Sequence, residues 1–213
     1  VIESIPFPLR ESMEETLTLL APTAHTKNLE LSMRISPQLP DSLIGDAMSI
    51  KQVLINLAGN AIKFTDKGSV TIDIECEHLE KNEATIRVTV ADTGIGIEQS
   101  KQESLFEAFG QADKSITRLY GGTGLGLVIS KRLANEMKGN IGFSSSENQG
   151  STFWFTFQCQ LNPIPLSTPL ETDSLVGRKL LYLEPHTHSR IATAEVLESW
   201  AVQVYTATSI EQL

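Results

Sequence analysis

The sequence predicts an α/β fold, followed by a linker and a short second unit. Three observations support this prediction. Helical and strand patterns alternate over the first 160 residues, a stretch rich in Pro, Ser and Thr follows Leu161, and a β-α-β pattern comes after that stretch. With 40% hydrophobic and 20% charged residues, the 213-residue chain has the composition of a globular protein.

Each expected element rests on its own pattern. Apolar residues at helical spacing predict helices over 7–27, 49–64 and about 124–137. Alternation of apolar and polar residues predicts strands over 29–36, 69–76, 84–92, 140–146 and 151–160. A short polar helix and an irregular stretch occupy about 98–121.

The domain organisation follows from the change in composition. Residues 1–160 are expected to form one domain, and 161–176 a linker, because its Pro, Ser and Thr content is typical of linkers. Residues 177–213 are expected to begin a second domain, with strands near 177–185 and 201–207 around a helix at 189–200. Such a short β-α-β segment buries too little apolar surface for a core of its own.

Charge and cysteine content exclude several classes of function. The formal net charge is −9 and no basic block is present, which argues against nucleic acid as a partner. Cys76 and Cys159 lack metal-ligand spacing and are expected to be reduced thiols. No apolar run reaches the length of a membrane span.

A glycine-rich segment precedes the third helix, in the sequence RLYGGTGLGL at 118–127. The Lys-Ser/Thr of a P-loop and the glycine spacing of a dinucleotide fold are both missing. The segment still leads into a helix N-terminus, where free N–H groups favour an anion. Contact with a phosphate group and a simple hinge both remain possible for these glycines.

Two further groups of residues favour a ligand. Asp92 ends an apolar strand and is followed by Gly94 and Gly96, which fits either a turn cap or a carboxylate that accepts from the amine of a flat base. Asn56, Asn60 and Lys63 are spaced i, i+4 and i+7 and share one helix face. Amide oxygens suit Mg²⁺ that carries phosphates, and a lysine offsets phosphate charge.

Four segments, taken in order, resemble a known family. NLAGNAIKF, DTGIGI, LFEAFGQAD and GGTGLGL are similar to the N, G1, F and G2 boxes of the histidine-kinase catalytic (ATP-binding) domain, over about residues 5–160. The similarity is greatest to hybrid sensor kinases of the GacS/BarA type. It implies a two-layer α/β sandwich (the Bergerat ATP-binding fold), with a mixed sheet of about five strands and three helices on one face.

The resemblance also implies residue roles around the base and the metal. Asp92 would bind the adenine amino group, with Gly94 and Gly96 lining the base and Thr152 at the adenine site. Asn60 would ligate Mg²⁺, with Asn56 close by, and Lys63 would meet the phosphates. The catalytic residues would therefore be Asn56 and Lys63. The other residues implied in ATP binding are Phe64, Phe109, Arg118, Gly122, Thr123, Gly124, Leu125, Gly126 and Leu127.

For function, the resemblance implies transfer of the γ-phosphate of Mg-ATP to a histidine on a separate dimerisation domain, in two-component phosphorelay signalling. In related ATPases a glutamate at the position of Asn56 activates water, and an amide cannot act as that base. None of His25, His78, His186 and His188 has the context of the phospho-accepting histidine. A non-catalytic adenine-nucleotide-binding module is the alternative function.

The implied partners are upstream dimerisation helices, downstream receiver domains and a response regulator, in the cytoplasmic part of an inner-membrane-anchored bacterial sensor kinase. Any membrane contact would come through segments outside this chain. The tail resembles the start of a receiver domain, but Pro185 follows Glu184 where a second acid is required, which indicates a degenerate receiver. The tail could be disordered, dock on the ATP-binding domain or pair with a second copy, and weak self-association is the expected outcome.

Overall fold

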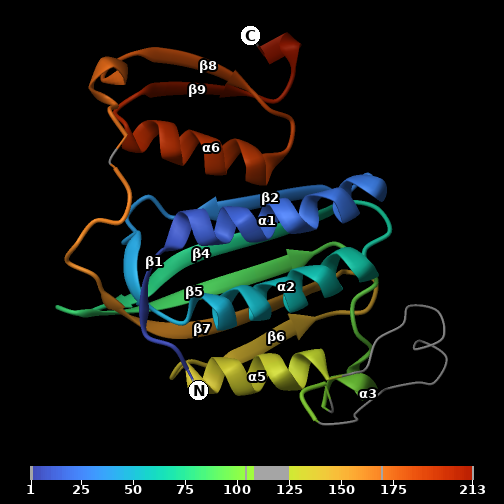
Figure 1. Ribbon diagram of the computed structural model, residues 1–213. Helices are drawn as coiled ribbons and strands as arrows, with labels where there is room; N and C mark the ends of the chain where they lie inside the picture. Colours follow the sequence, from blue (N-terminus) through green and yellow to red (C-terminus); the bar gives the residue numbers. More distant parts are fainter. Residues whose placement is uncertain (1, 104, 108–124, 169, 213) are drawn as a thin grey trace.

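The computed structural model describes residues 2–103, 105–107, 125–168 and 170–212 (Figure 1). In chain order, the elements within these residues are β1 (Ile5–Pro8), α1 (Leu9–Thr26), β2 (Glu30–Ile35), β3 (Ser42–Gly45), α2 (Ala47–Phe64), β4 (Ser69–Leu79), β5 (Glu83–Asp92), α3 (Gln99–Gln102), α5 (Gly126–Glu136), β6 (Ile141–Ser145), β7 (Ser151–Leu161), η1 (Asp173–Leu175), β8 (Lys179–Leu183), α6 (Thr187–Ser199), β9 (Gln203–Ala207) and η2 (Ile210–Gln212).

The main sheet is mixed and has helices on one face. Among the described residues seven strands form it, in the order β1-β3-β7-β5-β4-β2, with β6 also paired to β7. β2 and β4 run parallel, and the other neighbours are antiparallel. α1, α2 and α5 lie together over one face of this sheet (Figure 1). The predicted fold class is therefore confirmed.

The sheet has two more strands than the sequence predicts. The additional strands, β1 and β3, are four residues each and pair with each other, and β3 also pairs with the end of β7. Two of the four residues of β1 are prolines, and β3 is too short to show an alternating pattern. Short strands that contain proline are typical of sheet edges, because proline cannot donate to a ladder.

The core lies between the sheet and the helices. Alternate residues of the central strands point to the helical layer and are almost completely buried, whereas the intervening residues are largely polar. From the sheet these buried residues are Val70, Ile72, Ile74, Ile86, Val88, Val90, Phe155 and Phe157. α2 contributes the matching apolar stripe, which includes Ile50, Val53, Leu54 and Leu57. The opposite face of the sheet carries no helix of the first 161 residues within the described part of the chain.

A second, two-stranded parallel sheet is formed by β8 and β9, which α6 connects. α6 lies between this small sheet and β2 of the main sheet (Figure 1). The tail therefore docks on the larger part of the chain. Its self-association stays a prediction, since it needs a second copy of the chain. The domain boundaries at 160 and 177 likewise stay proposals.

Both cysteines are free, and Cys159 is buried in the sheet. Burial raises the pKa of the Cys159 thiol to about 12, so this side chain is a protonated, apolar group at neutral pH. Within the described residues, no helix is both long and apolar enough to cross a bilayer.

Candidate functional site

The candidate site begins where β5 ends, at Asp92. Asp92 occupies the register position that continues the inward-facing residues Val88 and Val90, so its side chain lies on the helical side of the sheet. Its Oδ1 accepts hydrogen bonds from the backbone N–H groups of Gly94, at 2.8 Å, and Ser151, at 3.3 Å. Both bonds within the described residues end on Oδ1, which leaves Oδ2 as a hydrogen-bond acceptor.

The environment of Asp92 changes its ionisation. Burial raises the pKa of the carboxyl, and the hydrogen bonds from Gly94 and Ser151 oppose that effect without cancelling it. A half-buried carboxylate whose pKa is raised by desolvation is typical of binding and catalytic sites. Asp92 therefore has the acceptor chemistry that an exocyclic amine requires.

The loop after Asp92 is held tightly between two other elements. A Cβ atom on Gly94 would lie 2.4 Å from the carbonyl oxygen of Phe64, at the end of α2. Gly96 has a φ angle of +66°, and a Cβ atom there would lie 2.0 Å from the carbonyl oxygen of Ser146. Only glycine fits at both positions. At Gly94 the reason is the close approach to Phe64, and at Gly96 it is both the close approach to Ser146 and the positive φ angle. The two glycines therefore place this loop between α2 and the β6–β7 turn.

Asn56 links α2 to α5. Its Nδ2 donates to the buried Oγ of Ser130 at 2.9 Å, and a Cβ atom on Gly126 would lie 2.3 Å from its Oδ1. Gly126 therefore lets the first turn of α5 approach the amide of Asn56. Asn60 lies one turn farther along the same face of α2 and is half-buried.

The last turn of α2 carries Lys63 and Phe64. The Nζ of Lys63 lies 4.9 Å from the centre of the Phe64 ring, a distance that allows a cation–π interaction. The carbonyl oxygen of Phe64 accepts from the N–H of Ile95 at 3.3 Å. Lys63 and the loop after Asp92 therefore lie at the same end of the helical layer.

Lys27, which the sequence analysis does not identify, caps this end of α2. Its Nζ donates to the carbonyl oxygens of Ile62, Lys63 and Thr65 at 2.9, 2.8 and 3.0 Å. Carbonyl groups at a helix C-terminus have no partner within the helix and carry partial negative charge. The ammonium group therefore fixes the turn on which the site residues lie.

Some predicted site residues lie outside the described residues, namely Phe109, Arg118, Gly122, Thr123 and Gly124. Within the described part, α5 begins at Gly126, and Leu127 packs against the core, whereas Leu125 is partly exposed. The structure therefore brings Gly126 close to Asn56 and places Leu125 and Leu127 at the start of the same helix.

The register of β7 distinguishes Thr152 from Ser151. Ser151 pairs with Asp92, and Thr152 pairs with Ala91. Successive strand residues point to opposite faces, so Ser151 shares the face of Asp92, and Thr152 points to the other side of the sheet. Ser151 is buried, and its Oγ lies 3.0 Å from the Oγ of Ser145. The hydroxyl beside Asp92 therefore belongs to Ser151, a residue that the sequence analysis missed.

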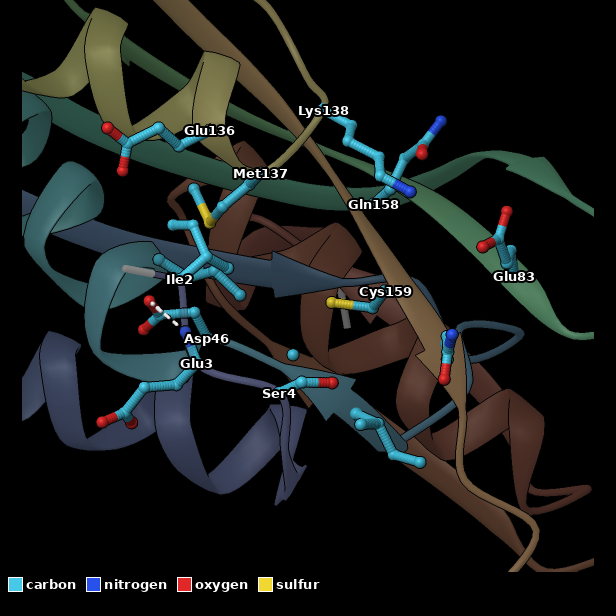
Figure 2. A pocket seen from close by; sticks show the side chains of 14 residues that line it. Ile2, Glu3, Ser4, Asp46, Glu83, Glu136, Met137, Lys138, Gln158 and Cys159 are labelled. Atoms are coloured by element: carbon cyan, nitrogen blue, oxygen red, sulfur yellow. Dashed lines mark hydrogen bonds between the residues drawn. The ribbon is translucent and has the colours of Figure 1, made fainter.

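A cavity of about 150 Å³ lies at the other end of α2 (Figure 2). Residues 2–4, the strands β3 and β7 and the end of α5 line it, together with Asp46, the N-cap of α2. Asp46 accepts from Ser49 N–H and from Glu3 N–H, the second bond being drawn in Figure 2. None of the predicted site residues lines this cavity.

The described residues contain no group of three or more His, Cys, Asp or Glu side chains that could hold a metal ion. The Mg²⁺ ligands expected from the sequence are of another type, the amide oxygens of Asn60 and Asn56.

A family model described as "Histidine kinase-, DNA gyrase B-, and HSP90-like ATPase" matches residues 45–161, more than half of the chain. The chain belongs to this ATPase family. The match begins just before α2 and ends with β7, so it includes Asn56, Asn60, Lys63 and Asp92.

Curated relatives from this family are sensor kinases. The chain is 46% identical to the signal transduction histidine-protein kinase BarA of Escherichia coli K12. The 204 aligned residues cover 96% of this chain and 22% of BarA. It is 41% identical to the sensor histidine kinase GacS of Pseudomonas protegens, over 100% of this chain and 23% of GacS. The chain thus spans less than a quarter of the length of these relatives.

Solved structures of histidine kinases share the fold. Full-length ShkA in complex with AMPPNP has a TM-score of 0.78 and 32% identity, covering 98% of this chain and 42% of ShkA. The catalytic domain of ThkA has a TM-score of 0.57 and 30% identity, covering 73% of this chain and 95% of that domain. The predicted resemblance to the histidine-kinase ATP-binding domain is confirmed.

The substitution Asp92→Asn is expected to weaken binding of an adenine nucleotide by roughly 10- to 150-fold, since a hydrogen bond to a charged group contributes about 1.5–3 kcal/mol. Because an Asn side chain also donates, the preference for ATP over GTP should shrink. Isothermal titration calorimetry with both nucleotides measures these effects. Binding of ATP within a few-fold of the wild type would exclude Asp92 as the base-binding group.

The Asp92→Asn variant should also change how the stability of the fold depends on pH. The raised pKa of Asp92 means that the folded protein holds this proton more tightly than the unfolded chain does. Stability is therefore lost as the pH rises through the pKa of the folded state. An Asn at this position has no such loss, so the thermal midpoint of the nucleotide-free variant at neutral pH should equal or exceed that of the wild type.

The substitution Lys27→Met should lower the free energy of unfolding by about 1–3 kcal/mol, because charge-assisted hydrogen bonds to buried carbonyls are lost. It should also weaken nucleotide binding several-fold, since the last turn of α2 supports the loop after Asp92. Lys67→Met is the matched control, because Lys67 is exposed in the turn after α2. Unchanged affinity in Lys27→Met, together with lost stability, would restrict Lys27 to a role in folding.

Proposed function

We propose that this chain is the ATP-binding part of a sensor histidine kinase, which binds Mg-ATP around Asp92 and transfers the γ-phosphoryl group to a histidine on a separate dimerisation domain. The observation that carries the proposal is the arrangement at the end of β5. There, a half-buried carboxylate whose Oδ2 accepts no hydrogen bond from the described residues lies beside a loop whose glycines fit against α2 and the β6–β7 turn. Family membership and the kinase relatives support it.

The residues present fit an adenine nucleotide. Asp92 can accept from the exocyclic amine of adenine, and the loop that begins at Gly94 lies beside the carbonyl group of Phe64 at the end of α2. The neighbouring helix face offers the amide of Asn60 for Mg²⁺, which prefers oxygen ligands, and the ammonium of Lys63 for phosphate. ShkA, a solved relative, was determined with the ATP analogue AMPPNP, which supports ATP as the ligand.

In the proposed mechanism, the bond between the γ-phosphorus of ATP and the β–γ bridging oxygen breaks as the histidine nitrogen bonds to that phosphorus, and ADP is the leaving group. The residues of this chain position the nucleotide and balance its charge. Asp92 orients the base. Asn60, with Asn56 nearby, would hold Mg²⁺, which would help to neutralise the phosphates, and Lys63 would offset the remaining negative charge. α5 begins at Gly126, against the amide of Asn56, and the free N–H groups of a helix N-terminus favour a phosphate.

Asn56 accounts for the choice of phosphoryl acceptor in this proposal. Its amide donates to Ser130 and cannot remove a proton from water near neutral pH. Bound ATP is therefore retained until a stronger nucleophile arrives. A histidine of the dimerisation helices would be that nucleophile, followed by transfer to receiver domains and a response regulator. We place the chain in the cytoplasmic part of a membrane-anchored kinase.

The histidines of this chain have other partners or positions. His78 lies 3.1 Å from Glu80, His186 lies 2.9 Å from Glu184, and His188 contacts Ser32 and Asp73. His25 lies in the last turn of α1. The proposed transfer therefore has to be tested with a second protein domain.

The test combines this chain with the dimerisation helices of its own full-length protein. Incubation with γ-labelled ATP and Mg²⁺ should label the helices with phosphate that is stable to alkali and lost in acid, as expected for phosphohistidine. Asp92→Asn should show little label. Tight ATP binding without any labelled helix would instead support a non-catalytic nucleotide-binding module.

Asn60→Ala should separate the role of the metal from that of the base. We expect it to weaken ATP binding strongly in Mg²⁺ and only slightly in EDTA, because the proposed contact is made through the ion. Calorimetric titrations in the two buffers measure the difference, with Gln52→Ala, an exposed residue of α2, as the control. An equal loss in both buffers would mean that Asn60 only supports the structure.

A further inference from the structure

The face of the main sheet that the helices leave open is polar at β2 and β4. In β2, Leu31, Met33 and Ile35 pack toward the core, so Glu30, Ser32 and Arg34 point to the opposite face. Asp73 of β4 pairs with Arg34 in the parallel register and shares that face. These four residues, Glu30, Ser32, Arg34 and Asp73, are called the β2–β4 polar surface below.

α6 lies in the tail, which is called the receiver-like segment 177–213 below, and covers this surface. Ser32 is only 7% exposed although it points away from the core, and α6 is the element of the tail that packs against β2 (Figure 1). The apolar side of the small sheet does not make the contact, since Leu181 and Tyr205 remain 56% and 54% exposed. The segment is therefore held through polar side chains and not through its exposed apolar residues.

Two side chains of α6 make the central contacts. Nδ1 of His188 lies 2.7 Å from the Oγ of Ser32, and its Nε2 lies 3.1 Å from the Oδ2 of Asp73. Nε of Arg34 donates to the Oε2 of Glu195 at 2.7 Å, and its Nη1 donates to the Oδ1 of Asp73 at 3.2 Å. His188 and Glu195 are seven residues apart, so they project from the same side of the helix.

A third contact lies at the start of α6. Ser189 Oγ donates to Glu30 Oε1 at 2.7 Å, and His186 Nδ1 lies 3.6 Å from Glu30 Oε2. Each residue of the β2–β4 polar surface thus meets a group of complementary charge or hydrogen-bonding capacity. This match depends on the side chains of both partners. A helix of the same shape with other side chains would leave Arg34 without the carboxylate of Glu195 and Asp73 without the imidazole of His188.

The cluster is stronger than scattered surface ion pairs. The side chains of Arg34, Asp73, His188 and Glu195 are each between one fifth and one third exposed, so solvent screens them only in part. Burial raises the pKa of Asp73, but the hydrogen bonds and charges of His188 and Arg34 outweigh that effect and hold the pKa below its ordinary value. A neutral His188 can also donate to Asp73 and accept from Ser32, so the contact does not require a protonated ring.

We propose that the β2–β4 polar surface is the docking site that holds the receiver-like segment 177–213 against the ATP-binding domain. The partner that it fits is a helix that presents an imidazole and a carboxylate two turns apart. The docked helix lies on the face of the sheet opposite the helical layer, whereas Asp92 and α2 lie on the other side. The structural alignment with ShkA spans almost the whole chain and therefore includes this segment.

Hydrogen–deuterium exchange of the full-length chain tests the proposal. In Glu195→Arg, which places two cations together, the amides of α6 should exchange at least about tenfold faster than in the wild type, as expected when a docked unit opens locally. Glu198→Arg is the matched control, because it makes the same charge change at an exposed position of the same helix. His188→Leu should act in the same direction as Glu195→Arg.

The exchange rates distinguish docking within one chain from global unfolding and from pairing between two copies. Unchanged thermal midpoints and ATP affinities would show that the ATP-binding domain of the variants is folded. Equal exchange in Glu195→Arg, Glu198→Arg and the wild type would overturn the proposal. Protection of α6 that grows with protein concentration would also overturn it, because the docking surface would then belong to a second copy.

Discussion

The carbonyl groups at the C-terminal end of α2 meet two partners, the ammonium group of Lys27 and the loop that follows Asp92. Lys27 compensates the partial negative charge of the helix end, so the last turn can be held rigidly without a glycine cap. The carbonyl oxygen of Phe64 then fixes the position of Gly94 and Ile95. The position of Asp92 relative to Asn60 and Lys63 therefore depends on how this one helix ends.

The long elements of the fold could be predicted from the sequence, because periodicity over ten or more residues averages out local exceptions. α2 combines a regular apolar stripe with an N-cap at Asp46, and β5 alternates without interruption up to Asp92. β1 and β3 could not be predicted, since four residues are too few to establish a period and proline argues against a strand. Their pairing depends on where β7 ends, which is tertiary information.

For the candidate site, the sequence identifies residues whose types are unusual for their element. Asp92 at a strand end and two asparagines inside a helix are examples, and the resemblance to a family gives their proposed roles. Lys27 and Ser151 carry no such local signal. Lys27 acts on carbonyl groups 35 to 38 residues away, and Ser151 differs from Thr152 only by strand register. Choosing between neighbouring strand residues requires the pairing, because a shift of one residue exchanges the faces of the sheet.

The same alternation allows one sheet to serve two separate purposes. Along β4, Ile72 and Ile74 fill the core beneath the helices that carry the proposed nucleotide site, and Asp73 between them faces α6. The helical layer requires apolar side chains, whereas the open face can vary as long as it stays compatible with water or with a polar partner. A docking site can therefore be added on the open face without disturbing the core. Because the two sets of side chains point in opposite directions, tail docking and the proposed nucleotide site share the backbone of β4 but use different side chains of that strand.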